Sequence, residues 1–304
     1  MNQGPLIFLG ALLALAASWC GMVVVPNVQI GRQQQVAAGP SNSRYPAIPS
    51  GEAQRGRDVY RAQGCFYCHT TNVRQSGAKF DVVLASAGTN KAALASGLRA
   101  ARPGLTPAEV SQIMEQAPKP VLQGLTRAEA ETALKHLTVP DAKAEIILVP
   151  TGPDIERGWG RRMSVAQDYL FDQPLMLSKQ RIGPDLTTIA ARQRDPSWHL
   201  LHLYNPQSKV NGSTMPPYRF LFEKRKIGRH PSPDALQLTG EDAVEPGYEV
   251  VPTERARALV AYLLSMDAQF GLFEAPLPVE PKRPDATTNQ PSATAPTNAA
   301  PTNR

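Results

Sequence analysis

The residues CFYCH at positions 65–69 constrain this chain more than any other part of its sequence. Thiols at the spacing of Cys65 and Cys68 can form a disulfide switch, hold half of a zinc site or attach a haem covalently, and His69 directly after them favours the haem. A structural zinc site needs four ligands, usually from a second Cys or His pair. The third cysteine, Cys20, lies in an apolar run, and the other histidines show no zinc-finger spacing.

The residues before the motif argue against a thioredoxin-like switch. Such a dithiol follows a buried strand within a βαβ unit, whereas residues 55–64 (RGRDVYRAQG) read as a short amphipathic helix. The motif therefore predicts one covalent haem c, attached through Cys65 and Cys68, with His69 as an iron ligand. A disulfide and a zinc site remain the alternatives.

Pro184, in the segment RIGPDL, offers a partner for the histidine. Proline has no backbone N–H and keeps its segment out of a helix, which leaves a carbonyl free. Such a carbonyl can accept a hydrogen bond from Nδ1 of His69 and thereby fix the ring and its tautomer.

Met215 is the predicted second ligand of the iron. It lies in the loop NGSTMPPYRF, where Pro216 and Pro217 disfavour a helix after the sulfur. A thioether on a stiff loop suits a low-spin haem with His and Met ligands and raises its reduction potential. Met163 and Met176 are interpreted as packing residues.

His199 and His202 lie in the segment DPSWHLLHLYNP, which Asp195 can cap as a helix. At positions i and i+3, the two imidazoles share one helical face. Either could replace Met215 in a bis-imidazole haem. With no carboxylate or cysteine beside them, we favour polar residues near the haem rim or at an interface, and their roles stay open.

Residues 253–267 (TERARALVAYLLSMD) predict a closing helix capped by Thr253. An apolar stripe runs along one face of this helix, formed by Ala256, Leu259, Val260, Leu263 and Leu264. We expect it to pack across the helix before the cysteines and to complete a small all-helical haem pocket.

Residues 6–25 form an uninterrupted, mostly apolar run. A helix of that length spans about 30 Å, the thickness of the bilayer hydrocarbon. The run has no basic segment before it and no A-x-A cleavage site at its end, and Trp19 before Cys20 does not fit a lipoprotein signal. We therefore expect an uncleaved, single-pass membrane anchor.

The expected orientation of this anchor follows from the haem rather than from charge. Arg32 and Arg44 follow the run and no Lys or Arg precedes it, so the positive-inside rule does not support a periplasmic body. Haem c is attached outside the cytoplasm, however, and we expect the haem domain on the periplasmic side of the inner membrane. The net charge of +6 comes from scattered residues and gives no indication of a nucleic-acid surface.

The predicted parts of the haem protein follow one another in a fixed order along the chain. They are the anchor, RGRDVYRAQGCFYCH, RIGPDL, WHLLHLYNPQSKVNGSTMPPY and the closing helix. They resemble the monohaem cytochrome c subunit (subunit II, O-type) of cbb3-type cytochrome c oxidases, over residues 1–75 and 156–270. The resemblance implies one haem c ligated by His69 and Met215. It also implies an electron-transfer subunit, not an enzyme on its own. Such a subunit takes electrons from a soluble or subunit cytochrome c and passes them to the catalytic haem–copper subunit.

The block between these stretches predicts a separate small α/β domain. Residues 79–86 and 144–149 read as strands, which we expect at the edges of the domain. Residues 90–101 read as an alanine-rich helix, and two more helices begin at capping boxes. The boxes are Thr106 with Glu109 and Thr126 with Glu129.

The sequence of this block is similar to that of the C-terminal domain of the bacterial ribosomal stalk protein. The matching residues run FDVVL, NKAAL, GLTPAEVSQIMEQAPKPVLQGLTRAEAETALKHL and AKAEI. In that family the domain docks other proteins. A ribosomal role does not fit a periplasmic insertion, so the resemblance implies the fold and an unidentified protein partner only.

Together these patterns predict a mainly α protein with five parts. They are a transmembrane anchor (1–28), a linker (29–50), an all-helical cytochrome c-like haem domain (51–78 and 151–272), an inserted α/β domain (79–150) and a disordered tail (273–304). One alternative function is the small cytochrome subunit of another respiratory complex, such as nitric oxide reductase, which should lack the W-H-x-x-H-L…M-P-x-Y stretch. The other is a haem-based redox-sensing adaptor, which should carry a kinase, cyclase or chemoreceptor-like region.

Overall fold

The computed structural model describes residues 3–38, 43–178 and 180–272. The segment 273–304, expected to be a disordered tail, lies outside the described residues. The described chain divides into two compact units. One contains the chain up to Ala78 and from Pro150 onward, and the other contains Lys79–Val149.

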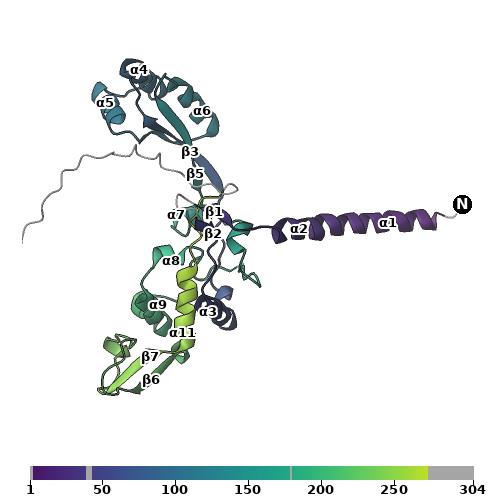
Figure 1. The fold of residues 1–304 in the computed structure, drawn as a ribbon, viewed down its shortest axis with the longest axis vertical. Coiled ribbons are helices and arrows are strands. Elements are labelled where there is room, and N and C mark those ends of the chain that lie inside the picture. The colour runs from purple at the N-terminus through teal and green to yellow at the C-terminus, as the bar shows by residue number, and fades with distance from the viewer. Residues whose placement is uncertain (1–2, 39–42, 179, 273–304) are drawn as a thin grey trace, which may run out of the picture. The chain divides into compact units, whose positions relative to one another are not determined.

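The N-terminal apolar run is helical throughout (Figure 1). It forms α1 (Gly4–Trp19), a π-helical turn (Cys20–Val24) and α2 (Val25–Gly31). The stretch Gly4–Gln29 is long enough and apolar enough to cross a membrane, judged on length and composition alone.

The rest of the first unit combines helices with two short antiparallel sheets. Its helices are α3 (Gly51–Ala62), α7 (Pro153–Glu156), α8 (Ile189–Arg192), α9 (Pro196–Tyr204), α10 (Pro206–Lys209) and α11 (Glu254–Ser265). Its strands are β1 (Val36–Ala38), β2 (Ser43–Tyr45), β6 (Phe222–Lys226) and β7 (Tyr248–Pro252). Short 3-10 turns occupy Cys65–Tyr67, Ala166–Tyr169, Arg219–Leu221 and Gly240–Asp242. The pair β1–β2 therefore lies within the stretch expected to be a linker.

Helices α3 and α11 pack against each other at the centre of this unit. A Cβ atom on Gly56 would lie 1.8 Å from the carbonyl oxygen of Ala258, so glycine is required for this close approach. Tyr60 and Tyr262 meet edge to face across the same contact, with ring centroids 5.3 Å apart. The Oγ1 of Thr253 accepts a hydrogen bond from the first turn of α11. The closing helix expected from the sequence is confirmed.

The expectation that this unit is all-helical is wrong. Strand β6 pairs antiparallel with β7, from Phe222 opposite Pro252 to Lys226 opposite Tyr248. The residues FEKRK of β6 show no apolar alternation, because all but Phe222 are exposed. Partners more than twenty residues apart in sequence stabilise the hairpin, and no local pattern indicates it.

A fully buried ion pair connects distant parts of the first unit. The side chains of Arg162 and Asp168 are 1% and 2% exposed and meet through hydrogen bonds of 2.9 and 2.7 Å. The hydroxyl of Tyr45 donates to the same carboxylate at 2.6 Å, and Nε of Arg162 donates to the carbonyl of Phe270. Burial alone would lower the pKa of Arg162, but the Asp168 carboxylate outweighs that effect and raises it.

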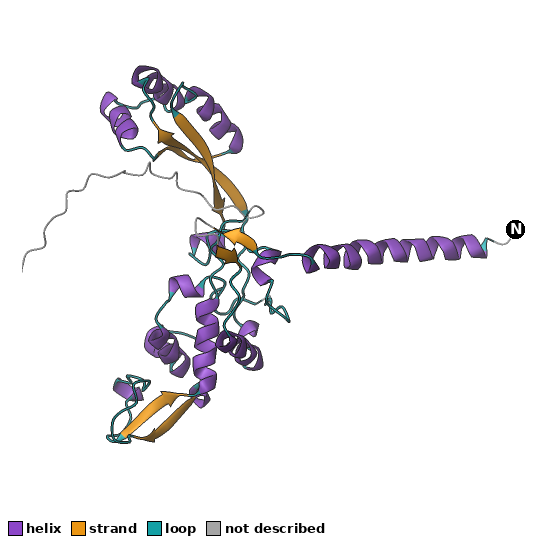
Figure 2. Ribbon diagram, in the orientation of Figure 1, coloured by secondary structure: helices purple, strands orange, loops and turns teal. Residues whose placement is uncertain are grey.

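The second unit is a three-stranded sheet with three helices on one side (Figure 2). In chain order it contains β3 (Gly77–Ser86), α4 (Lys91–Ala101), α5 (Pro107–Glu115), β4 (Lys119–Leu125), α6 (Arg127–His136) and β5 (Lys143–Thr151). The helices and the sheet enclose a core that includes Val82, Leu94 and Leu137, all of which are completely buried. Both predicted capping boxes are present.

Residues 79–86 and 144–149 were expected to form the two edge strands, but only the second of them lies at an edge of the sheet. The order is β4-β3-β5, so β3 is central, and β4 was not predicted at all. Pro120 and Gly124 interrupt β4, and such residues usually mark turns. The pairing of β3 with β4 is also irregular, with register shifts around Val82.

The two ends of the inserted segment meet. The backbone N–H of Ser76 donates to the carbonyl of Thr151 at 3.0 Å, so the chain leaves and re-enters the first unit at one place. An insertion with adjoining ends lengthens a host loop without pulling it apart, and loop-closure entropy grows only slowly with length.

Replacing residues 79–150 by a short Gly/Ser linker should therefore leave the first unit folded. The excised segment should unfold cooperatively by itself, because its core draws only on its own residues. Thermal unfolding of the linker variant and of the isolated segment, each followed by circular dichroism, checks both statements. An unstructured segment or an unfolded host would contradict the two-unit description.

Candidate cofactor site

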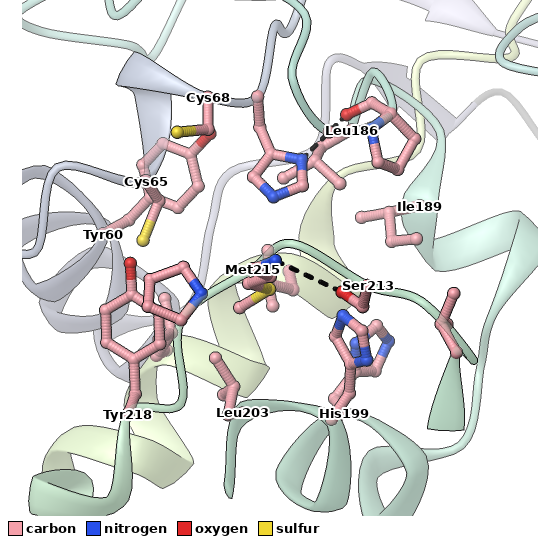
Figure 3. Close-up of a pocket in the computed structure, with 18 of the residues that line it drawn as sticks. Tyr60, Cys65, Cys68, Leu186, Ile189, His199, Leu203, Ser213, Met215 and Tyr218 are labelled. Atoms are coloured by element: carbon pink, nitrogen blue, oxygen red, sulfur yellow. Dashed lines mark hydrogen bonds between the residues drawn. The ribbon is translucent and has the colours of Figure 1, made fainter. Parts of the chain in front are cut away.

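The five site residues predicted from the sequence line one cavity in the first unit. It is enclosed by α3, the turn with the cysteines, the loop before α8, α9, the loop after α10, and α11. Figure 3 shows Cys65, Cys68 and Met215 projecting toward this cavity, with Leu186, Ile189 and Leu203 contributing apolar walls.

The turn after α3 places the two thiols. Gly64 adopts a left-handed conformation (φ 69°), which ends α3 and begins the 3-10 turn Cys65–Tyr67. Both Cys65 and Cys68 are free thiols. Burial raises the pKa of Cys65 to about 12.

His69 is fixed by the backbone of the predicted loop. Its Nδ1 lies 2.8 Å from the carbonyl oxygen of Pro184, an arrangement in which the ring donates from Nδ1. The N–H of Gly183 donates to the carbonyl of Cys68 at 3.0 Å and brings the loop against the ring. A Cβ atom on Gly183 would lie 2.3 Å from Cε1 of His69. Nε2 is therefore the ring nitrogen that remains available to bind a metal ion, and burial lowers the pKa of His69.

A buried polar network holds the Pro184 loop in place. Asp185 is completely buried and accepts hydrogen bonds from Oγ1 of Thr70 at 2.6 Å and from the N–H of Asn72 at 2.7 Å. Arg181 bridges Thr70 and Asp154. Sequence reasoning missed the roles of Asp185 and Arg181, although both belong to the RIGPDL segment.

Met215 lies on a loop anchored to α9. The N–H of Tyr218 donates to the carbonyl of Leu203 at 2.8 Å, and Oγ of Ser213 accepts from the N–H of Met215 at 3.3 Å. Met215 packs against the core of the first unit. Met176 is buried in the same core, as expected of a packing residue.

The histidine pair of α9 also lines the cavity. Asp195 caps the helix as predicted, accepting from the N–H groups of Ser197 and Trp198. Nε2 of His199 lies 2.9 Å from the carbonyl of Gln193. His202 stacks on Trp198 but leaves its buried Nδ1 without a hydrogen-bond partner.

These residues fit a covalent haem better than a zinc ion. Within the described residues, no group of three or more His, Cys, Asp or Glu side chains could hold a metal ion. The cavity instead offers the two thiols, the imidazole of His69 with Nδ1 bonded to the backbone, and the thioether of Met215. The hydroxyl of Tyr60 and Nδ1 of His202 are buried polar atoms left without partners at its walls. This donor set is typical of haem c with His and Met ligands.

Two segments of the chain match known families. Residues 150–239 match the family model of the cytochrome C oxidase mono-heme subunit/FixO. Residues 80–147 match that of the ribosomal protein L7/L12 C-terminal domain. Both resemblances are confirmed. The first match contains Pro184 and Met215 and begins after Cys65, Cys68 and His69.

The inserted segment also has similar relatives. The large ribosomal subunit protein bL12 of Chromobacterium violaceum is 46% identical over 68 residues, which is 22% of this chain and 54% of the relative. The bL12 protein of Histophilus somni is 42% identical over 74 residues, covering 24% and 60%. The chain thus spans little more than half the length of these relatives.

Proposed function

We propose that this protein is a membrane-anchored monohaem c-type cytochrome that relays electrons to the catalytic subunit of a cbb3-type haem–copper oxidase. One observation supports it most: Cys65, Cys68, His69, Pro184 and Met215 converge on one apolar cavity. The family match over residues 150–239, to the mono-haem subunit of cytochrome c oxidase, supports the assignment to that complex.

Different residues of the chain would attach the haem, bind its iron and orient the histidine. Cys65 and Cys68 would attach it through two thioether bonds, while Nε2 of His69 and the sulfur of Met215 would bind its iron. Pro184 keeps the imidazole in one tautomer through its carbonyl. When bound, haem c supplies a one-electron iron couple. Apolar walls lower the local dielectric constant around it and limit the contact of the iron with water.

The same proposal gives a role to the N-terminal apolar helix and to the inserted segment. The span Gly4–Gln29 anchors the protein in the inner membrane by a single pass, with the haem domain on the periplasmic side. A soluble or subunit cytochrome c donates the electrons. The inserted segment contacts a protein partner.

A purified preparation should keep its haem on the polypeptide after denaturation and acid–acetone extraction, because two thioether bonds hold it. It should also copurify from mild detergent with a haem–copper catalytic subunit. Haem staining of a denaturing gel and mass spectrometry of the copurified proteins measure the two results.

The matched control is the double variant Cys65→Ala/Cys68→Ala, which should lose all haem staining. If the unmodified chain released its colour and held zinc or a disulfide instead, the proposal would fail. If haem stayed but a different respiratory complex copurified, only the assignment to the oxidase would fail.

A further inference from the structure

The loop that carries Pro184 lies against the segment that carries His69. The carbonyl of Pro184 meets Nδ1 of His69 at 2.8 Å, and a backbone hydrogen bond joins the two segments on each side of this contact. These two bonds run from the N–H of Gly183 to the carbonyl of Cys68 at 3.0 Å and from the N–H of Leu186 to the carbonyl of Thr70 at 2.8 Å. The place of the Pro184 carbonyl at the ring therefore depends on how firmly the two segments are held together.

The side chain of Asp185 joins the same two segments. It is completely buried, and its Oδ2 accepts hydrogen bonds from Oγ1 of Thr70 at 2.6 Å and from the N–H of Asn72 at 2.7 Å. Its Oδ1 accepts from the N–H of Thr187 at 2.8 Å, and the guanidinium of Arg181 lies 4.0 Å from Oδ2. Three donors and a nearby cation suit an ionised carboxylate, and hydrogen bonds to a buried anion are strong.

These contacts act on the residues next to the hydrogen bond of His69. Asp185 directly follows Pro184, and its partner Thr70 directly follows His69. The bond between Asp185 and Thr70 thus fixes the carbonyl and the imidazole relative to each other. The acceptor of the N–H of a metal-binding histidine orients the ring and raises its basicity. A side chain that holds this acceptor in place can therefore set the strength of the ligand without touching the metal.

We propose that Asp185 is a positioning residue for His69, which holds the Pro184 carbonyl at Nδ1 and thereby lowers the reduction potential of the haem. The inference rests on the proposed function. A stronger hydrogen bond from Nδ1 makes the imidazole a better electron donor, which favours the oxidised state of the iron. The fixed negative charge of the carboxylate acts in the same direction, because it stabilises the more positive iron. Loss of this carboxylate should therefore raise the potential.

The test compares two variants of the full-length holoprotein with the unmodified one. Asp185→Asn keeps the size of the side chain and removes its charge, while Thr70→Val keeps the charge and removes the hydrogen bond from Thr70 to the carboxylate. Redox titration gives the midpoint potential, and NMR of the reduced protein with isotope-labelled histidine follows the proton on Nδ1 of His69. We expect a higher potential in Asp185→Asn and a smaller rise in Thr70→Val. The Nδ1 proton should shift upfield in both, since a weaker hydrogen bond leaves it more shielded.

The matched control is Asp168→Asn, which removes a buried carboxylate from the same unit at a position outside the cavity. This substitution should lower stability and leave both the potential and the Nδ1 proton of His69 unchanged. Equal changes in the control would reduce Asp185 to a general structural role and overturn the inference.

The two readouts also separate positioning from charge. A raised potential with an unmoved Nδ1 proton in Asp185→Asn would overturn the inference, because the charge alone would then be responsible. An unchanged potential and proton in both variants would overturn it as well. If Asp185→Asn does not fold, Thr70→Val decides, and an unmoved proton there counts against the inference. If the unmodified protein carries no covalent haem, the proposed function fails instead.

Discussion

Replacing Met215 by alanine should lower the reduction potential of the haem by on the order of 0.1 V, within the range of about 0.8 V that axial ligands set. The sulfur-to-iron charge-transfer band should disappear as well. A thioether stabilises the reduced iron, so its loss favours the oxidised state. Covalent attachment should persist, because Cys65 and Cys68 lie on a separate segment after α3. Redox titration and the near-infrared absorption spectrum measure both effects.

The control for this substitution is Met163→Ala. Met163 is 41% exposed and does not line the cavity, so its removal should leave the band and the potential unchanged. An unaltered spectrum in Met215→Ala would move the sixth ligand to Met176 or to the pair His199 and His202.

Replacing Asp168 by alanine should destabilise the first unit by about 3–5 kcal/mol. The substitution leaves the Arg162 guanidinium buried without its carboxylate and removes the acceptor of the Tyr45 hydroxyl. For a unit of this size, the melting temperature should fall by on the order of 10 °C. Chemical denaturation in detergent, followed by tryptophan fluorescence, measures the loss.

Two further variants isolate the cause. The double variant Arg162→Met/Asp168→Leu should recover much of the lost stability, because an apolar pair removes the uncompensated charge. Asp58→Ala breaks an exposed pair with Arg61 in the same unit and should change stability by under about 1 kcal/mol, because the side chains of Arg61 and Asp58 are 50% and 62% exposed. Equal effects of Asp168→Ala and Asp58→Ala would contradict the assignment of a special role to the buried pair.

The site residues were accessible to sequence reasoning because their chemistry is local. Covalent haem attachment requires two thiols and a histidine within five residues, and Cys65, Cys68 and His69 supply them. Pro184 and Met215 lie in short segments where proline restricts the backbone. The structure then brings Pro184 to 2.8 Å from His69 across 115 residues of sequence.

The residues that support the site were not accessible in that way. Asp185, Arg162 and Asp168 carry charges, and charged residues usually indicate a solvated surface. Their burial depends on partners distant in the sequence, such as Thr70 for Asp185.

Among the secondary-structure elements, too, those with local sequence signals could be predicted and those that depend on distant partners could not. Helices α5, α6 and α11 begin at side-chain caps that can be read from three or four consecutive residues. Strands β4 and β6 have no alternating apolar pattern, and what defines each of them is its pairing with a partner strand, β3 for β4 and β7 for β6.

The hydrogen bond between Ser76 and Thr151 has a consequence for the order of folding. The core of the first unit joins α3 to α11, and contacts between such distant segments are slow to form because a long loop must close first. The inserted unit has a core of its own, and β3 and β5 are neighbours in its sheet. When it folds early, its two ends come together and the loop that remains to be closed is shorter by the whole of Lys79–Val149. An inserted domain that folds first thus lowers the entropy cost of closing the loop between α3 and α11 in the first unit.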